Sequence, residues 1–108
     1  MKTWIFSIAV AGLLSTGLAL AADKPGDAAK GKKVFDQCSV CHNTTTDDVK
    51  VGPSLKGLYK HATLKNGKKV TDATVKAKID EGGNGMPSYK DLLSDGDKGD
   101  LLAYLKTL

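Results

Sequence analysis

Residues 38–42 of this sequence are Cys38-Ser39-Val40-Cys41-His42, a motif with a specific chemical use. The two cysteines lie three positions apart, so each thiol can form a thioether bond to one edge of a haem. The histidine that follows can then reach the iron from one face as the proximal ligand. The pattern Cys-x-x-Cys-His therefore predicts one covalently bound haem c, attached through Cys38 and Cys41, with His42 on the iron.

Two other uses of paired cysteines fit this sequence less well. A thioredoxin-like redox motif opens a helix directly after a strand, whereas residues 38–42 follow a predicted helix and no strand of useful length is found. A zinc site needs a tetrahedral set of ligands, and Cys38, Cys41, His42 and the distant His61 do not have a familiar spacing for one.

The N-terminal residues have the features of a secretory signal peptide. Lys2 gives a positive start, residues 4–22 are uncharged, and Ala19-Leu20-Ala21 fits a small-residue cleavage site. We therefore expect residues 1–21 to be a cleaved signal peptide and residues 22–108 to be a single domain in the periplasm, where haem is joined to such motifs. An uncleaved membrane anchor is the alternative, because the run is nearly long enough to span a bilayer.

The composition and net charge of the chain indicate which kind of partner it binds. The chain has 108 residues, a formal net charge of +4 and no arginine. Its basic character is compatible with nucleic-acid binding, but export and the lack of arginine favour an acidic protein partner instead. Six lysines fall in a stretch without any acidic residue: Lys50, Lys56, Lys60, Lys65, Lys68 and Lys69. They either form a docking face for that partner or are solvated loop residues that favour solubility.

The apolar periodicity predicts short helices only. Asp27 can cap a helix over residues 28–37, and Leu55, Leu58 and Tyr59 can share a face of a brief helix. Thr71 can cap a helix that runs to Glu81 and ends at two glycines. Ser94 and Asp97 resemble a capping box, and the final helix after them places its core-facing residues at Leu101, Tyr104, Leu105 and Leu108.

The second axial ligand of the iron is predicted to be Met86. It lies in the irregular segment 82–87, whose glycines allow the backbone to approach a flat cofactor and whose Pro87 restricts the chain after the ligand. A thioether is a neutral donor, and an axial methionine raises the reduction potential of a haem. His61 and a lysine are the other candidate ligands, and Met86 as an ordinary residue of the core is the alternative to ligation.

Four features in this order resemble the class I c-type cytochromes, particularly the short bacterial and photosynthetic electron carriers. They are Gly31 with Phe35, the motif at residues 38–42, Gly52-Pro53-Ser54-Leu55-Lys56-Gly57-Leu58, and Met86-Pro87 followed by a helix with Leu101 and Tyr104. The resemblance implies an all-α, small class I cytochrome c fold. In it, three to five short helices wrap around one covalent haem, and the N- and C-terminal helices cross.

The resemblance also implies roles for individual residues. Gly31 and Phe35 would meet Leu101 and Tyr104 at the helix crossing. The carbonyl of Pro53 would accept a hydrogen bond from His42 Nδ1, which fixes the ring, and Leu55 would pack on the haem. His61 would lie near a haem propionate, and Tyr59 and Tyr89 are candidates for the pocket wall. The tryptophan–propionate contact of many relatives is absent, because Trp4 lies within the predicted signal peptide.

Together these observations predict a soluble, periplasmic, monomeric monohaem cytochrome that carries single electrons between redox partners and is not an enzyme. Nucleic-acid binding and stable membrane insertion after cleavage are not expected. Two alternatives remain open: a haem protein with an open sixth position that acts as a peroxidase or gas sensor, and a cytochrome subunit of a dehydrogenase or oxidase complex.

Overall fold

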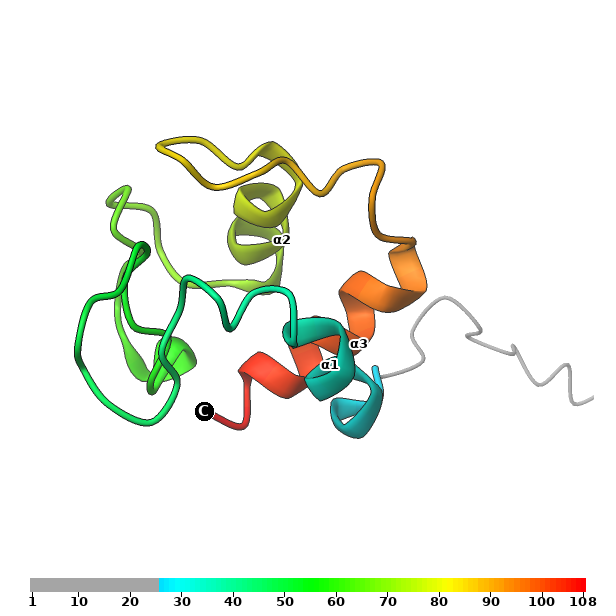
Figure 1. Cartoon of the computed structure of the whole chain (residues 1–108), viewed down its shortest axis with the longest axis horizontal. Helices are drawn as coiled ribbons and strands as arrows, with labels where there is room; N and C mark the ends of the chain where they lie inside the picture. The colour runs from blue at the N-terminus through cyan, green and yellow to red at the C-terminus, as the bar shows by residue number, and fades with distance from the viewer. Residues whose placement is uncertain (1–25) are drawn as a thin grey trace, which may run out of the picture.

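The computed structural model describes residues 26–108, and the predicted signal peptide lies outside this range. Three α-helices and one short 3₁₀ helix form the fold (Figure 1): α1 (Ala28–Phe35), η2 (Leu58–Lys60), α2 (Asp72–Glu81) and α3 (Asp95–Leu105). Only two isolated β-bridges, and no strand, occur within residues 26–108, so the predicted all-α fold class is confirmed. None of the helices in this range combines the length and the apolar character needed to cross a bilayer.

Each α-helix begins at the residue that the sequence predicted. The Asp27 carboxylate accepts hydrogen bonds from the first-turn backbone of α1. Thr71 and Ser94 form capping boxes at the starts of α2 and α3, which satisfies backbone N–H groups that have no partner within the helix.

The helix ends agree less closely with the prediction. α1 ends at Phe35 rather than near Gln37, because the amides of Asp36 and Cys38 donate to carbonyls three residues back, at Lys33 and Phe35, and tighten the chain out of the α-helical pattern. α3 ends at Leu105, so Leu108 packs against the core from beyond the helix and not from its face.

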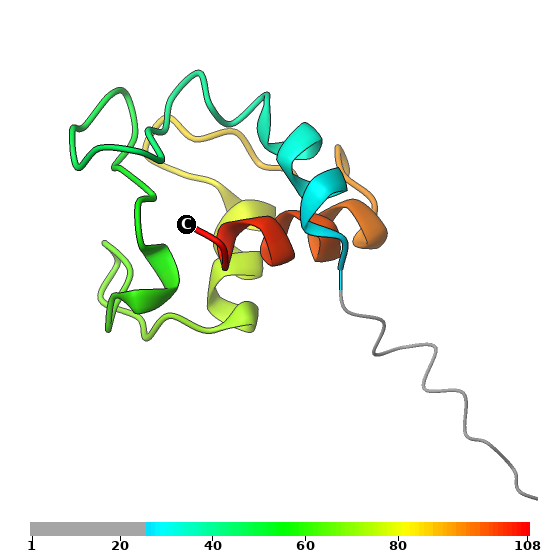
Figure 2. The ribbon, with the colours of Figure 1, turned by 90° about the horizontal axis from the view of Figure 1, so that it is seen from below.

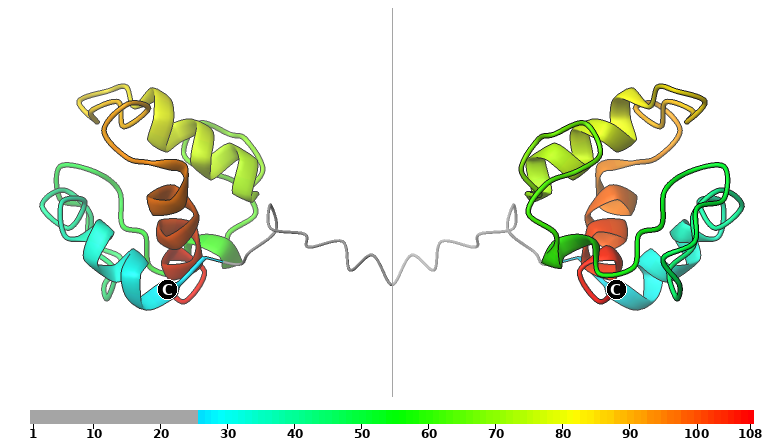
Figure 3. Two further views of the ribbon diagram at one scale, coloured as in Figure 1. Left: turned by 90° about the vertical axis from the view of Figure 1, so that its right-hand side faces the viewer. Right: turned by 90° about the vertical axis from the view of Figure 1, so that its left-hand side faces the viewer.

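The α3 helix occupies the centre of the fold. It lies between α1 on one side and α2 on the other (Figures 2 and 3). The segments that follow α1 and α2 both extend to the same side of α3 (Figure 3). This arrangement brings the Cys-x-x-Cys-His segment and the Met86 segment to the same side of one helix, although they are far apart in sequence.

The predicted crossing of α1 and α3 is present and depends on a close backbone approach. A Cβ atom placed on Gly31 would overlap the carbonyl oxygen of Asp100 and lie 2.9 Å from Tyr104 Cβ. Only glycine leaves room for this approach. One turn later, the rings of Phe35 and Tyr104 pack with centroids 5.3 Å apart at an angle of 52°, a tilted geometry that contributes about 0.5–1.5 kcal/mol beyond burial.

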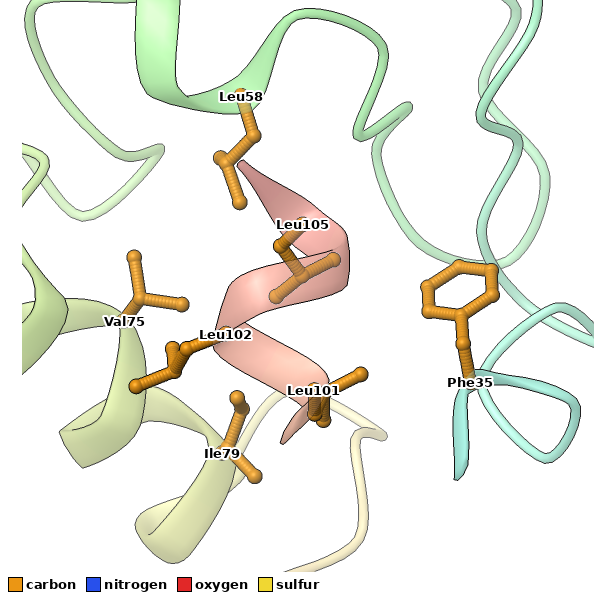
Figure 4. Close-up of a cluster of buried hydrophobic side chains, with 7 residues drawn as sticks. All are labelled: Phe35, Leu58, Val75, Ile79, Leu101, Leu102 and Leu105. Carbon is orange, nitrogen blue, oxygen red and sulfur yellow. The ribbon is translucent and has the colours of Figure 1, made fainter. Parts of the chain in front are cut away.

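The buried core is small. Leu101, Leu102 and Leu105 project from α3 between Phe35 on α1 and the two buried residues of α2 (Figure 4). The buried apolar residues are Phe35, Leu58, Val75, Ile79, Leu101, Leu102 and Leu105. A domain of this size buries a limited core and is often stabilised by a cofactor.

The helix crossing yields a first prediction. Gly31→Val should lower the free energy of unfolding by about 1–3 kcal/mol, because the added side chain forces α1 away from the Asp100 carbonyl. Gly99→Ala is the matched control: it adds a methyl group on α3 where no heavy atom lies within 4 Å, and it should be neutral or stabilising. Denaturant unfolding of the haem-containing protein measures both, and equal stabilities would contradict the close crossing.

Candidate haem-binding site

All six predicted site residues line one cavity. Its volume is about 720 Å³, which is within the range of about 300–1,000 Å³ typical of cofactor and ligand sites. The predicted residues on its wall are Cys38, Cys41, His42, Pro53, Leu55 and Met86. The helix-to-loop segment after α1 supplies the first three of these, the segment before η2 supplies the next two, and the segment after α2 supplies the last.

The His42 ring is fixed by the hydrogen bond that the resemblance implied. Its Nδ1 lies 2.7 Å from the Pro53 carbonyl oxygen. A carbonyl oxygen can only accept, so Nδ1 must carry a proton, and in a neutral imidazole ring this places the lone pair on Nε2. A free Nε2 in a cavity wall is the form of histidine that can coordinate iron, and the hydrogen bond increases its basicity.

The backbone around His42 is held to the segment that contains Pro53. The Gly52 amide donates to the Cys41 carbonyl at 2.8 Å, and the Leu55 amide donates to the Asn43 carbonyl at 2.8 Å. A Cβ atom on Gly52 would lie 2.5 Å from His42 Cε1. The absence of a side chain at residue 52 therefore lets the backbone cover one face of the imidazole ring, a contact that the sequence reasoning did not identify.

Met86 is placed by a tight turn. The Gly83 amide donates to the Met86 carbonyl at 2.9 Å, and the Met86 amide donates back to the Gly83 carbonyl at 3.0 Å. The two residues between them, Asn84 and Gly85, have φ values of 53° and 90°. Positive φ at both central positions is the pattern of a type I′ turn, for which Asn-Gly is the preferred sequence. The turn leaves the half-buried Met86 in the cavity wall, packed against the core.

The two cysteines are half-buried and do not form a disulfide with each other. Burial raises the pKa of Cys38, and the neighbouring Cys41 raises it further. The pKa of Tyr89 is also raised, first by burial and then by the two cysteines. Tyr89 lines the cavity with them, so this candidate for the pocket wall is in place.

Of the other two residues predicted near the haem, His61 lies in the cavity wall and Tyr59 does not. His61 is exposed, lines the cavity, and places Nε2 3.2 Å from the Lys56 carbonyl oxygen. Tyr59 is not part of the wall, because its hydroxyl donates to Asp72 at 2.8 Å at the start of α2. Burial, followed by this hydrogen bond, raises the Tyr59 pKa.

The cavity wall suits a flat apolar cofactor with one metal ion. Besides the residues named above, its apolar members are Val49, Val51, Leu58, Leu64, Val75, Ile79, Pro87 and Leu105. Several of these also belong to the core. Helical periodicity alone therefore did not distinguish the residues that only pack in the core from those that also line the cavity. A neutral imidazole and a thioether are donors that haem iron accepts, and the residues present therefore fit a haem. No group of three or more His, Cys, Asp or Glu side chains in residues 26–108 could hold a metal ion.

Comparison with known proteins identifies the family. A family model described as cytochrome c oxidase, cbb3-type, subunit III matches residues 26–105. Cytochrome c6 of Synechocystis sp. is 35% identical over 100 residues, which cover 91% of this chain and 77% of that protein. The chain belongs to the class I c-type cytochromes.

Two further relatives agree with this assignment. Cytochrome c6 of Leptolyngbya boryana is 39% identical over 70 residues, which cover 64% of this chain and 78% of that protein. Cytochrome c-550 of Bacillus subtilis is 36% identical over 77 residues, covering 70% of this chain and 57% of the relative. Family membership confirms the predicted resemblance and fold, supports haem c as the cofactor, and agrees with the prediction that this cytochrome is not an enzyme.

The covered face of His42 yields a second prediction. Gly52→Ala should displace the imidazole ring and weaken its hydrogen bond to Pro53, since the new methyl group would lie 2.5 Å from Cε1. We expect a loss of about 1–3 kcal/mol in unfolding free energy and a shift of the His42 ring signals in NMR spectra of the haem-containing protein. Gly99→Ala again controls for a methyl group added in open space. Ring signals that stay at their parent positions would contradict the contact.

Proposed function

We propose that this cytochrome is an exported, soluble, monomeric carrier of single electrons. One observation carries the proposal: a single cavity collects the two cysteines, a histidine with a free Nε2, and a methionine on a rigid turn. A haem in that cavity would supply one-electron chemistry by cycling its iron between the ferrous and ferric states. Residues 1–21 would be the cleaved signal peptide and residues 22–108 the domain that works in the periplasm.

Each residue of the site has a separate task in this proposal. Cys38 and Cys41 would attach the haem, His42 and Met86 would hold its iron, and Leu55 would pack on it. The Pro53 carbonyl keeps the His42 ring in one tautomer. If His42 and Met86 both bound the iron, no coordination position would be left open for a substrate. This distinguishes the carrier from a peroxidase or gas sensor.

The lysine-rich stretch gives the carrier a candidate docking face for an acidic partner. All six lysines between residues 50 and 69 are exposed, and Lys56 and Lys65 belong to the cavity wall. Positive charges beside the haem would attract an acidic redox protein and increase its association rate.

A fixed subunit of an oxidase complex is the second candidate function. It is favoured by the description of the matching family model, which is that of an oxidase subunit. Such a subunit would co-purify with its complex, whereas the proposed carrier would be isolated alone.

The axial role of Met86 yields the third prediction. Met86→Ala and Met86→Leu should both abolish the weak red absorption band of methionine–iron coordination and allow added imidazole to bind. The reduction potential should fall by about 0.1 V or more, since axial ligands set haem potentials over a range of about 0.8 V. The leucine variant keeps most of the side-chain volume, so it separates sulfur ligation from packing. Leu92→Ala truncates an exposed side chain in the following segment and should leave band and potential unchanged. Parent-like spectra in both Met86 variants would reject the proposed ligand.

The docking face yields the fourth prediction. Electron transfer to an acidic redox protein should slow about tenfold when ionic strength rises from about 0.01 M to about 1 M, because the Debye length shortens from about 30 Å to about 3 Å. The charge reversal Lys56→Glu with Lys65→Glu should lower the low-salt rate and flatten its salt dependence. The pair Lys32→Glu with Lys33→Glu, exposed on α1 outside the stretch, is the control of equal charge. Stopped-flow rates measure both, and equal effects of the two pairs would remove the docking face from the proposal.

A further inference from the structure

Lys98 is a charged residue in an apolar position. It is only 4% exposed and is the one buried charged side chain within residues 26–108. On α3 it precedes Leu101, Leu102 and Leu105 by one or two turns, so it occupies the first position of the buried stripe of that helix. Burying an ammonium group lowers the stability of the fold unless the group is paired and hydrogen-bonded. The groups that contact Lys98 Nζ therefore indicate the role of this residue.

The Lys98 ammonium group joins three parts of the chain. Its Nζ lies 2.7 Å from Asp80 Oδ1 near the end of α2 and donates to the Lys90 carbonyl oxygen at 3.0 Å. Asp80 also receives Lys76 Nζ at 3.1 Å on its other oxygen. The pKa of Asp80 is held below its ordinary value, chiefly by the adjacent Lys98 ammonium group. One side chain of α3 is therefore bonded both to α2 and to the segment that follows Met86.

The same segment is bonded to the end of α2 at two neighbouring residues. The Ser88 hydroxyl donates to the Asp80 carbonyl, and the Tyr89 amide donates to the Ile79 carbonyl at 3.0 Å. Residues 88, 89 and 90 are thus held in succession: the first two by α2 and the third by Lys98. Asp80 takes part twice, through its backbone to Ser88 and through its carboxylate to Lys98.

We propose that Lys98 is a positioning residue for Met86. The inference rests on the proposed function, in which Met86 is an axial ligand of the haem iron. Met86 is held on its N-terminal side by the turn at residues 83–86. On its C-terminal side, residues 88–90 are anchored to two helices. Lys98 supplies the only bond of the described structure that ties the Lys90 carbonyl to α3, so without it this end of the methionine segment can move away from the cavity.

A second ion pair between the same two helices provides a matched control. Lys106 Nζ lies 2.9 Å from Asp72 Oδ2, which links the end of α3 to the start of α2. Both of its side chains are about half exposed, and neither lies in the cavity wall. Lys106→Met therefore removes a lysine from the same pair of helices without touching the methionine segment.

The experiment compares three variants of the haem-containing protein with the parent: Lys98→Met, Lys98→Met with Asp80→Asn, and Lys106→Met. Methionine has nearly the length of lysine without its charge. Lys98→Met alone leaves Asp80 paired with Lys76 but takes the partner away from its buried Oδ1. The double variant removes that carboxylate as well, and replacing a buried pair by neutral residues is often close to neutral for stability. It therefore serves as the test if Lys98→Met alone does not fold. The readouts are imidazole affinity of the ferric protein, the methionine–iron band, amide hydrogen exchange at Tyr89, and thermal stability.

We expect both Lys98 variants to bind imidazole about tenfold more tightly than the parent, a factor that corresponds to about 1.4 kcal/mol. The Tyr89 amide should exchange faster in both, because its hydrogen bond to Ile79 opens more often. The double variant should regain most of the thermal stability lost in Lys98→Met, yet keep the raised imidazole affinity. Lys106→Met should match the parent in imidazole affinity and in Tyr89 exchange.

The inference is overturned if the double variant has the imidazole affinity of the parent, whether or not Tyr89 exchange changes. In that case Lys98 serves stability alone. It is also overturned if Lys106→Met raises the affinity as much as the Lys98 variants do, since a general loosening of α2 and α3 would then explain the effect. Failure of the proposed function is seen separately: a parent protein without the methionine–iron band rejects Met86 as a ligand before any Lys98 variant is compared.

Discussion

The close approach of Gly31 to the Asp100 carbonyl sets the relative position of the first and last helices, and with it the position of the haem site. It fixes how α1 crosses α3, and the Asp27 amide reinforces it with a hydrogen bond to the Asp100 carboxylate at 2.8 Å. The first cysteine follows the end of α1 by only three residues, so the position of the crossing determines where Cys38 can lie. The contact between the Gly31 backbone and the Asp100 carbonyl thus determines the position of the cysteine half of the haem site.

The two halves of the site are held by different means. The histidine side depends on backbone: Gly52 covers the imidazole ring, and the Pro53 carbonyl holds its Nδ1. The methionine side depends on a turn of two residues with positive φ and on polar bonds from α2 and α3. Covalent attachment through Cys38 and Cys41 would fix the haem to the histidine side, so the methionine side is the half that has to be held against it by non-covalent bonds alone.

Much of this fold could be predicted because local signals agree with the tertiary structure. Asp27, Thr71 and Ser94 cap the helices for which the sequence predicted them, and the Cys-x-x-Cys-His spacing predicted residues that line one cavity. The spacing of residues in the sequence did not predict the position of Tyr59, whose hydroxyl donates a hydrogen bond to Asp72 outside the cavity wall. It also missed Gly52, since the reason for a glycine at that position is the face of a ring ten residues earlier. Contacts of this kind, between residues far apart in the chain, do not produce a periodic pattern in the sequence.

Lys98 shows how a break in a local pattern can itself be informative. Residues 98, 101, 102 and 105 have the spacing of one buried helix face, and three of them are leucines. A lysine in the remaining position contradicts the apolar pattern, and such contradictions tend to mark functional positions whose cost is offset elsewhere. Here the offset comes from Asp80 and the Lys90 carbonyl. An apolar residue there would avoid the cost of burying a charge, but it could not donate to a carbonyl in the segment after Met86. Met86, Tyr89 and Leu93 pack against the core, and the buried ammonium group adds directional bonds that apolar packing cannot supply.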